Sequence, residues 1–343
     1  MHVAMLAPIA WRVPPRHYGP WERVVGLLTE GLVALGAEVT LFATLDSETS
    51  ARLDGVCPRP YEEDPDIDAG VWSALHIGHA FQAVRAGETG RGPRFDVVHN
   101  HFDFRPLSYA GLVETPVVTT VHGFSSDRIL PAYRAARHTH FVSISDADRH
   151  PDLDYLATVW HGIDLPAFTF RADPDGYLLF FGRIHPDKGA ADAVELARLT
   201  GRRLVLAGIV QDERYWRDEV EPWVDGDRVR FVGSVGPAER DRLLGGASAL
   251  VHLIHFDEPF GLSVAEAMAC GTPVIARPRG SMPEIVRDGV DGALVGSVGE
   301  AAERLAEVEA LDRAAVRAGA RARFSQERMA RDYLDVYRRV VAG

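Results

Sequence analysis

The chain has 343 residues, of which 46% are hydrophobic and 25% charged, and its formal net charge is -12 at pH 7. At roughly 100–200 residues per domain, this length predicts two domains. The negative charge argues against a nucleic-acid partner, whose phosphates require a basic surface, and against stable association with an anionic membrane.

The cysteine content and the N-terminal residues both bear on the cellular compartment of the protein. Cys57 and Cys270 are far apart in the sequence and form neither a disulfide framework nor a zinc-binding spacing, which favours a reducing environment. The first residues have no basic start typical of a signal peptide, and no stretch approaches the ~18 apolar residues that span a bilayer. We therefore expect a cytoplasmic protein.

In the first half of the chain, short β-branched runs alternate with amphipathic segments. Residues 21–35, for example, repeat apolar side chains at helical spacing. Strands that alternate with helices predict βαβ units and a mostly parallel sheet. The expected strands are 2–7, 38–43, 96–99, 117–121, 140–143 and 157–160.

The same pattern begins again after a break rich in Pro and Asp at 166–175, which we interpret as a linker. Two open α/β domains in series are common to dehydrogenases, kinases and glycosyltransferases, so the motifs must distinguish among these classes. The expected strands are 177–181, 204–207, 229–232, 249–253 and 273–276, and the expected helices include 190–199 and 263–270.

The longest motif covers residues 258–276, which read EPFGLSVAEAMACGTPVIA. We expect a helix that is entered near Gly261, with Glu258 at or just before its N-terminus and Glu266 about two turns along it. Ionised carboxylates at these places can accept hydrogen bonds from hydroxyl groups of a sugar nucleotide. Alternatively, Glu258 is an acid at the helix entry without a further role, and Glu266 is a solvated residue on the face of the helix. However, Glu266 lies in an apolar stretch, where a charge is unfavourable unless it is paired or bound.

A second motif places two cations after a predicted strand. Arg183 follows Phe180-Phe181-Gly182, and Lys188 precedes Gly189. Two cations at a strand end suit a diphosphate and would stabilise a nucleoside-diphosphate leaving group, although two exposed cations without a role are the alternative. The chain has no GxxxxGK[ST] string, and its first loop has no GxGxxG string, which disfavours a P-loop kinase and a dehydrogenase.

The first loop and several histidines complete the candidate residues. The loop 14–22 reads PPRHYGPWE, and Gly19 in it permits close approach of the backbone to phosphate or acceptor, whereas Pro20 has no N–H to donate. His99 and His101 point the same way from a strand, but a metal site would need further ligands, and Asp103 is the nearby acid. We expect these histidines to be polar residues of a cleft, and we expect no metal.

The motif at 258–276 resembles the signature of the retaining glycosyltransferases of family 4, and the resemblance extends over nearly the whole chain. It implies an α/β fold of GT-B architecture, with two Rossmann-like domains whose parallel sheets face an interdomain cleft. The implied parts are an acceptor-binding domain at 1–165, a nucleotide-sugar-binding domain at 166–324 and a C-terminal helix at 325–343 that packs back on the first domain.

The resemblance also implies roles for individual residues. His161 and Pro20 replace the asparagine and glycine usual in the family, and their roles stay open. In the implied site, Glu258 and His122 contact the donor sugar, Arg183 and Lys188 hold the phosphates, Glu266 holds the ribose hydroxyls, Gly19 lies near phosphate and acceptor, Val232 and Gly233 frame the base, and the amides around Phe260, Gly261 and Leu262 contact sugar and diphosphate.

The implied reaction is the transfer of a sugar from a nucleoside-diphosphate donor to a hydroxyl of a small molecule or oligosaccharide, with retention of configuration and without a metal or other cofactor. A UDP-sugar is the most frequent donor in the family, and UDP would be the product. The length and composition resemble members from antibiotic pathways, the orthosomycin pathway among them. The alternatives are a phosphorylase or sugar-nucleotide epimerase on the same scaffold, and a non-catalytic sugar-nucleotide-binding protein.

Overall fold

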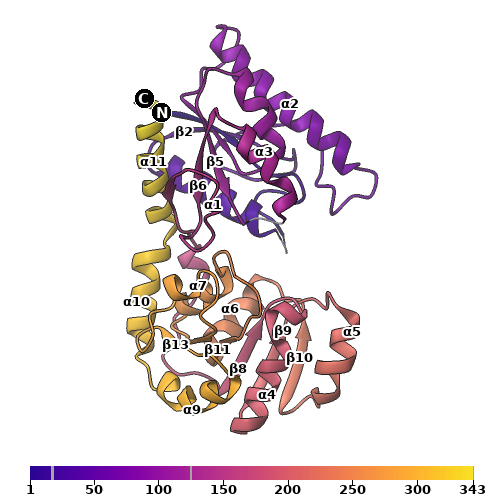
Figure 1. The fold of residues 1–343 in the computed structure, drawn as a ribbon, viewed down its shortest axis with the longest axis vertical. Helices are drawn as coiled ribbons and strands as arrows, with labels where there is room; N and C mark the ends of the chain where they lie inside the picture. Colours follow the sequence, from indigo (N-terminus) through magenta and orange to yellow (C-terminus); the bar gives the residue numbers. More distant parts are fainter. Residues whose placement is uncertain (17–18, 124–125, 343) are drawn as a thin grey trace. The chain divides into compact units, whose positions relative to one another are not determined.

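The structure is a computed structural model that describes residues 1–16, 19–123 and 126–342. It divides into two compact units, of which unit 1 comprises Met1–Gly162 and Gln326–Gly343, and unit 2 comprises Ile163–Ser325. The chain therefore leaves unit 1 once and returns to it for the last helix (Figure 1). The boundaries expected from the sequence follow residues 165 and 324.

The described residues of unit 1 form a seven-stranded parallel sheet with the order β3-β2-β1-β4-β5-β6-β7. The central strands of this sheet are almost entirely buried, and the two edge strands are partly exposed, as expected of a parallel sheet that helices cover on both faces. The strands are β1 (His2–Leu6), β2 (Glu38–Phe42), β3 (Arg52–Asp54), β4 (Val97–Asn100), β5 (Val117–Val121), β6 (Thr139–Ser143) and β7 (Tyr155–Thr158).

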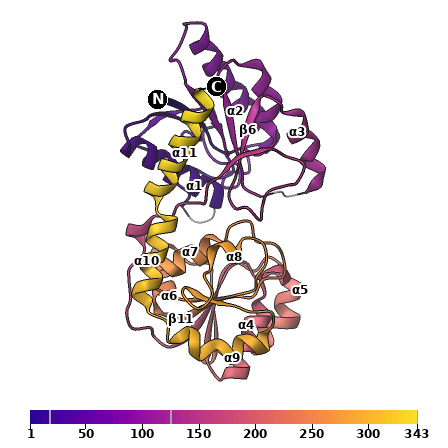
Figure 2. The same cartoon turned by 60° about the vertical axis from the view of Figure 1, so that its left-hand side comes forward.

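Helices cover both faces of this sheet. α1 (Pro20–Ala34) and α11 (Gln326–Val341) lie together on one side, and α2 (Ala69–Glu88) and α3 (Leu130–Ala135) lie on the other (Figures 1 and 2). α1 begins with a proline, whose missing N–H has no helical partner at that position. α11 packs closely on α1, since a Cβ atom on Gly31 would lie 2.9 Å from the Cβ atom of Ala330.

Unit 2, all of which is described, contains a six-stranded parallel sheet with the order β10-β9-β8-β11-β12-β13. α4 and α9 pack together, as do α7 and α10. The elements are β8 (Tyr177–Phe181), α4 (Ala190–Thr200), β9 (Arg203–Ala207), α5 (Glu213–Tyr215, continued by a π-helical turn at Trp216–Val220), β10 (Val229–Gly233), α6 (Pro237–Gly246), β11 (Ala247–His252), α7 (Leu262–Ala269), β12 (Val274–Ala276), α8 (Met282–Ile285), β13 (Gly292–Leu294), α9 (Val298–Glu309) and α10 (Arg313–Phe324).

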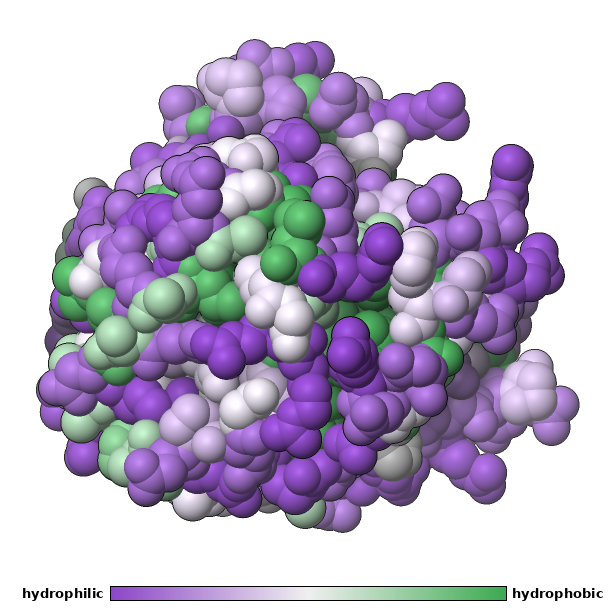
Figure 3. Space-filling model, turned by 90° about the horizontal axis from the view of Figure 1, so that it is seen from below, coloured by the Kyte–Doolittle hydropathy of each residue, from purple (hydrophilic) through white to green (hydrophobic). Residues whose placement is uncertain are grey.

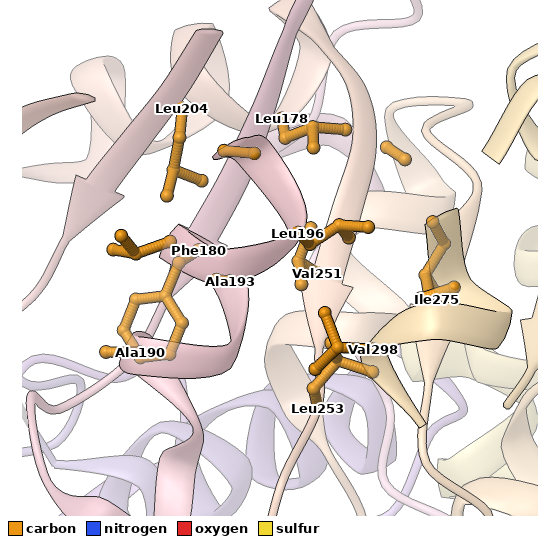
Figure 4. Close-up of a cluster of buried hydrophobic side chains, with 14 of the residues drawn as sticks. Leu178, Phe180, Ala190, Ala193, Leu196, Leu204, Val251, Leu253, Ile275 and Val298 are labelled. Carbon is orange, nitrogen blue, oxygen red and sulfur yellow. The ribbon is translucent and has the colours of Figure 1, made fainter. Parts of the chain in front are cut away.

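A large apolar cluster fixes the sheet of unit 2 against α4 and α9. Leu178 and Phe180 from β8 meet Leu196 from α4 and Val251 from β11, and Val298 of α9 closes the same cluster (Figure 4). The face seen in Figure 3 is mostly hydrophilic, and apolar side chains reach its surface in separate patches. The burial of these aliphatic side chains stabilises the sheet of unit 2. The polar residues that follow its strands do not belong to this core and are available to bind a ligand.

The expected fold class of two Rossmann-like domains with parallel sheets is confirmed. The observed strands lie within a few residues of those predicted. β3 and β13 have no counterpart in the prediction, because each has three residues and neither makes an apolar run long enough to distinguish it from a turn.

Candidate functional site

In unit 2 the strand order reverses between β8 and β11, which lie side by side in the sheet although β9 and β10 separate them in sequence. In open α/β sheets, ligands bind beyond the carboxyl ends of the strands at such a switch point. Arg183 and Lys188 follow β8, and Glu258 follows β11. The sequence motifs therefore meet at the place where the topology predicts a ligand.

Two glycines bring the loop after β8 against its neighbours. Gly189 has φ 73°, and a Cβ atom on it would lie 2.1 Å from the carbonyl oxygen of Leu253, just beyond β11. Gly208 has φ 146°, and its Cβ atom would lie 1.8 Å from the carbonyl oxygen of Gly182. Other residues cannot occupy these positions without displacing the backbone, which explains how Lys188 comes to lie beside the loop after β11.

The centre of the candidate site is the ion pair between Lys188 and Glu258. Lys188 Nζ donates a hydrogen bond of 2.6 Å to Glu258 Oε2, and the two side chains are 16% and 13% exposed. His252, the last residue of β11, places its Nε2 atom 3.6 Å from the same carboxylate oxygen. Lys188 Nζ also lies 4.2 Å from the centre of the Phe256 ring. A largely buried carboxylate thus faces one cation and one imidazole.

These neighbours determine the protonation of Glu258. Burial by itself would raise the pKa of the carboxyl group, but His252 and Lys188 favour its charged form and together lower the pKa to about 2. Glu258 is therefore a carboxylate at neutral pH and accepts hydrogen bonds without donating them. Arg183, which the sequence places with Lys188, donates to the side chain of Gln211 and does not pair with Glu258.

The turn at 279–282 holds the loop that carries Glu258. The backbone N–H of Ser281 donates to the carbonyl of Glu258 at 2.8 Å, and its hydroxyl donates to the carbonyl of Phe260 at 3.0 Å. Gly261 precedes α7 with φ 87°, and a Cβ atom there would lie 2.6 Å from Met282 Cε. α7 begins at Leu262, as expected of a helix entered near Gly261, and Glu258 lies four residues before it.

Glu266 lies about one turn into α7, not two as predicted, although the helix begins within one residue of its expected start at 263. Its carboxylate is nearly buried and pairs with Arg240 from α6, whose Nη1 lies 3.2 Å from Glu266 Oε1. The Arg240 guanidinium also lies 5.2 Å from the Phe168 ring. The expectation that a charge in this apolar helix needs a partner is therefore confirmed, although the sequence did not identify that partner.

Val232 and Gly233 close β10, beside the end of β9. The carbonyl of Gly233 accepts a hydrogen bond of 2.8 Å from the N–H of Gly208, and Gly233 itself has φ 69°. A Cβ atom on Gly233 would meet no atom of another described residue within 4 Å. Val232 is half-buried. The space over Gly233 is thus open, as a residue that frames a flat ligand requires.

In unit 1, Gly19 is the residue before α1 and has φ 138°. A Cβ atom on it would lie 2.8 Å from Pro15 Cβ and 3.1 Å from Trp11 Cβ. His17 and Tyr18 of the predicted loop lie outside the described residues. Glu22, in the first turn of α1, is 3% exposed and accepts a hydrogen bond of 3.2 Å from the N–H of Trp11. Burial raises the pKa of Glu22 to about 7.

The histidines at the ends of β4 and β5 form a buried polar network. His99 and His101 share one face of the chain, as their spacing predicts, and their ring centres lie 4.0 Å apart. The expectation that they line a cleft is wrong, since both are fully buried. His122 lies 2.8 Å from His101 and 3.4 Å from His161 through its two ring nitrogens, and its ring stacks on Trp21 at 5.3 Å.

The structure thus collects Lys188, Glu258 and His252 into one cluster and pairs Glu266 with Arg240. His252 could have been recognised from sequence as a polar residue at the carboxyl end of a predicted strand, whereas Arg240 has no such signal.

Among the residues that the structure describes, no group of three or more His, Cys, Asp or Glu side chains is placed to hold a metal ion. No helix within the described ranges has the length and apolar character needed to cross a membrane.

Comparisons with known families and proteins agree on one family. A family model described as "Glycosyl transferases group 1" matches residues 165–325, and one described as "Glycosyltransferase Family 4" matches residues 21–165. The chain is 30% identical to the D-inositol 3-phosphate glycosyltransferase of Mycolicibacterium smegmatis over 342 residues, which cover 82% of this chain and 76% of the relative.

Two further similarities cover almost the whole chain. The glycogen synthase of Mycobacterium tuberculosis is 28% identical over 377 residues, which cover 95% of this chain and 90% of the synthase. The crystal structure of AviGT4, a glycosyltransferase involved in avilamycin A biosynthesis, superposes with a TM-score of 0.73 at 26% identity and covers 100% of this chain and 98% of its own. Both similarities span the two units together.

Proposed function

The chain belongs to glycosyltransferase family 4, and from this premise we propose that it transfers a sugar from a nucleoside-diphosphate donor to a hydroxyl acceptor, with retention of configuration and without a metal ion. A UDP-sugar is the donor that we favour. The observation that carries the proposal is the largely buried Lys188–Glu258 pair at the switch point of unit 2. Arg183 precedes Lys188 in the segment that follows β8.

Each residue of this cluster has a charge suited to the reaction. Glu258 is ionised at neutral pH and accepts hydrogen bonds from hydroxyls of the donor sugar. Lys188 and Arg183 offset the negative charge that develops on the departing diphosphate, which is the work that a divalent cation performs in metal-dependent transferases. The first N–H groups of α7, at Leu262 and just after it, have no intrahelical partner and suit an anionic oxygen of the donor.

The nucleoside part of the donor is assigned to Glu266, Val232 and Gly233. Glu266 pairs with Arg240 through one of its two carboxylate oxygens, so it retains capacity for the two vicinal hydroxyls of ribose. The open space over Gly233 suits the base. In unit 1, His122 contacts a hydroxyl of the donor sugar, and the loop with Gly19 lies near phosphate and acceptor.

The similarity to AviGT4 supports a natural-product acceptor, such as an intermediate of antibiotic biosynthesis, over a structural polysaccharide. The inositol-phosphate and glycogen enzymes among the relatives provide two further hydroxyl acceptors to screen. No cofactor is required in this proposal, and UDP is a product.

The first test is an activity screen with full-length protein. UDP-, GDP-, TDP- and ADP-glucose are incubated with D-inositol 3-phosphate, a maltooligosaccharide and a panel of glycosylated antibiotics, in EDTA and again with Mg²⁺. We expect transfer from UDP-glucose in EDTA, with an anomeric configuration in the product, read by NMR, that matches the donor. Glu258→Gln should abolish transfer, whereas Glu303→Gln, an exposed residue on α9, should not affect it.

The other outcomes identify the alternatives. Turnover that requires inorganic phosphate would indicate a phosphorylase, and conversion of one sugar nucleotide to another without acceptor would indicate an epimerase. Binding of a nucleotide with no turnover on any acceptor would favour a non-catalytic binding protein. Inversion of configuration, or a strict requirement for Mg²⁺, would contradict the corresponding part of the proposal.

A further inference from the structure

His252, the last residue of β11, is buried without a full set of hydrogen bonds. Val251 and Leu253 on either side of it belong to the apolar cluster of Figure 4. Because successive side chains of an extended chain point to opposite faces, His252 points away from that cluster. The residue is 5% exposed, and its Nε2 atom makes no hydrogen bond to any described residue. A buried polar atom without a partner is unfavourable, so its presence requires an explanation.

Nε2 of His252 faces the carboxylate of Glu258. It lies 3.6 Å from Glu258 Oε2, which is too long for a hydrogen bond, while Lys188 Nζ lies 2.6 Å from the same oxygen. Glu258 is ionised, since its neighbours lower the pKa of the carboxyl group to about 2. A lone pair on Nε2 would be repelled by that charge, so Nε2 carries a hydrogen. His252 is thus a donor beside an acceptor that is already bonded to Lys188.

Lys188 has two tasks in the proposed function, on which this step rests. In the structure its ammonium group is bonded to Glu258, and in the proposed reaction it holds the diphosphate of the donor. A diphosphate carries more negative charge than one carboxylate and attracts Nζ away from Glu258. Glu258 is only 13% exposed, and a largely buried carboxylate that loses its cation is strongly destabilised. Donor binding therefore requires a second partner for Glu258.

We propose that His252 is a positioning residue for Glu258, and that its Nε2–H replaces Lys188 at Glu258 Oε2 when Lys188 binds a diphosphate. The two atoms, which are 3.6 Å apart in the structure, reach a hydrogen bond of about 2.9 Å through an approach of about 0.7 Å. Both contacts are to Oε2, so Oε1 remains available to hydroxyls of the donor sugar. Lys188 then holds the phosphates while Glu258 stays ionised and in place.

The first test needs no nucleotide, because Lys188→Met imitates the state in which Lys188 has left Glu258. Full-length variants are unfolded in urea at neutral pH. We expect His252→Leu to lower the folding equilibrium constant at least about tenfold more in the Lys188→Met background than in wild type, where Glu258 keeps its lysine. His252→Gln retains a side-chain N–H donor and should avoid most of this loss.

His255 supplies the matched control for this comparison. It is the next histidine along the chain, its side chain is 47% exposed, and its Nε2 lies 2.8 Å from Asp192 Oδ2. His255→Leu should have the same effect in wild type and in Lys188→Met. Equal effects of His252→Leu in the two backgrounds would overturn the proposal. If the double variant failed to fold while both single variants folded, this would be the expected non-additive loss in its largest form.

The second test measures the binding of UDP by calorimetry in EDTA. His252→Leu should weaken binding about tenfold, because the diphosphate takes Lys188 from Glu258 and no donor replaces it. In the Glu258→Gln background the same substitution should weaken binding no more than about twofold, since a neutral amide has no charge to be left unpaired. His252→Gln should bind UDP nearly as tightly as wild type. A loss of equal size in the two backgrounds would mean a purely structural role for His252 and contradict the proposal.

The two tests separate this proposal from the proposed function. A wild type that binds no nucleoside diphosphate would contradict the proposed function, and the exchange of partners at Glu258 would lose its trigger. The unfolding comparison uses no ligand, so additive effects of His252→Leu and Lys188→Met in a chain that does bind UDP would contradict the role of His252 alone.

Discussion

A Cβ atom on Gly280 would lie 2.4 Å from both the backbone nitrogen and the backbone oxygen of Glu258. Gly280 also has φ 54°, a conformation that other residues adopt only with strain. The position of the Glu258 carboxylate beside Lys188 therefore depends on a missing side chain in a different loop. The same turn holds Glu258 through the N–H of Ser281.

We expect Gly280→Ala to displace the Glu258 loop. Gly289→Ala is the matched control, because Gly289 has φ 72° and open space where its Cβ atom would lie. The strained backbone should destabilise the control by about 1–2 kcal/mol. The steric clash should cost Gly280→Ala about 1–3 kcal/mol more. Urea unfolding measures both free energies. Equal losses in stability, with equal transferase activity, would show that Gly280 does not hold Glu258.

The ion pair of Lys188 and Glu258 should behave as a coupled, largely buried pair. Lys188→Met and Glu258→Gln each leave a partner without its neighbour, so each single change should lower the free energy of unfolding by about 3 kcal/mol. The double variant should lose less than the sum, with a coupling of about 1–3 kcal/mol in a double-mutant cycle.

The exposed pair of Glu327 and Arg331 on α11 is the control for this cycle. Their side chains are 64% and 66% exposed, so a parallel cycle should give a coupling below about 0.5 kcal/mol. Similar couplings for the two pairs would contradict the view that Lys188 and Glu258 hold each other in a site shielded from water.

Glu22 should make stability depend on pH. Its pKa is raised from 4.5 to about 7 in the folded chain. Between these two pH values, the folded state therefore holds a proton that the unfolded state has released. Its contribution is therefore most favourable below pH 4.5, declines as the pH rises towards about 7, and is constant above that. The full change corresponds to about 3 kcal/mol.

Glu22→Gln removes this titration and retains an acceptor for the N–H of Trp11. Urea unfolding at pH 5, 6, 7 and 8 should show the variant gaining stability relative to wild type as the pH rises. Glu303→Gln, at an exposed position, should show no such trend. A constant difference between Glu22→Gln and wild type from pH 5 to pH 8 would mean that Glu22 is ionised throughout.

Two of the segments that the sequence singles out lie together in unit 2, because Lys188 and Glu258 each follow an apolar strand. Parallel strands present their carboxyl ends at one edge, so chain order alone brings these segments together. The sequence could not reveal Arg240 as the ion-pair partner of Glu266, since an arginine on a helix with many polar residues has many possible partners.

The burial of the histidines at the ends of β4 and β5 could not be predicted from the sequence, for a different reason. The alternation of His99 and His101 on β4 predicts a shared face, but the same pattern describes a cleft wall and a buried layer equally well. What decides between them is the packing of α11, whose Tyr333 and Tyr337 lie more than 200 positions away in the chain. Long-range packing of this kind has no local signal in a single sequence.

The last prediction concerns the ribose of the donor. If Glu266 holds the two ribose hydroxyls, wild type should bind UDP about 10- to 100-fold more tightly than its 2′,3′-dideoxy analogue, because hydrogen bonds to a charged group are worth roughly 1.5–3 kcal/mol. Glu266→Gln should lose most of this preference, and calorimetry in EDTA measures the affinities. Lys188→Met is the control, since loss of a phosphate contact should weaken both ligands equally and leave their ratio unchanged. A preference for UDP that survives in Glu266→Gln would place the ribose elsewhere and leave the Glu266–Arg240 pair with a structural role.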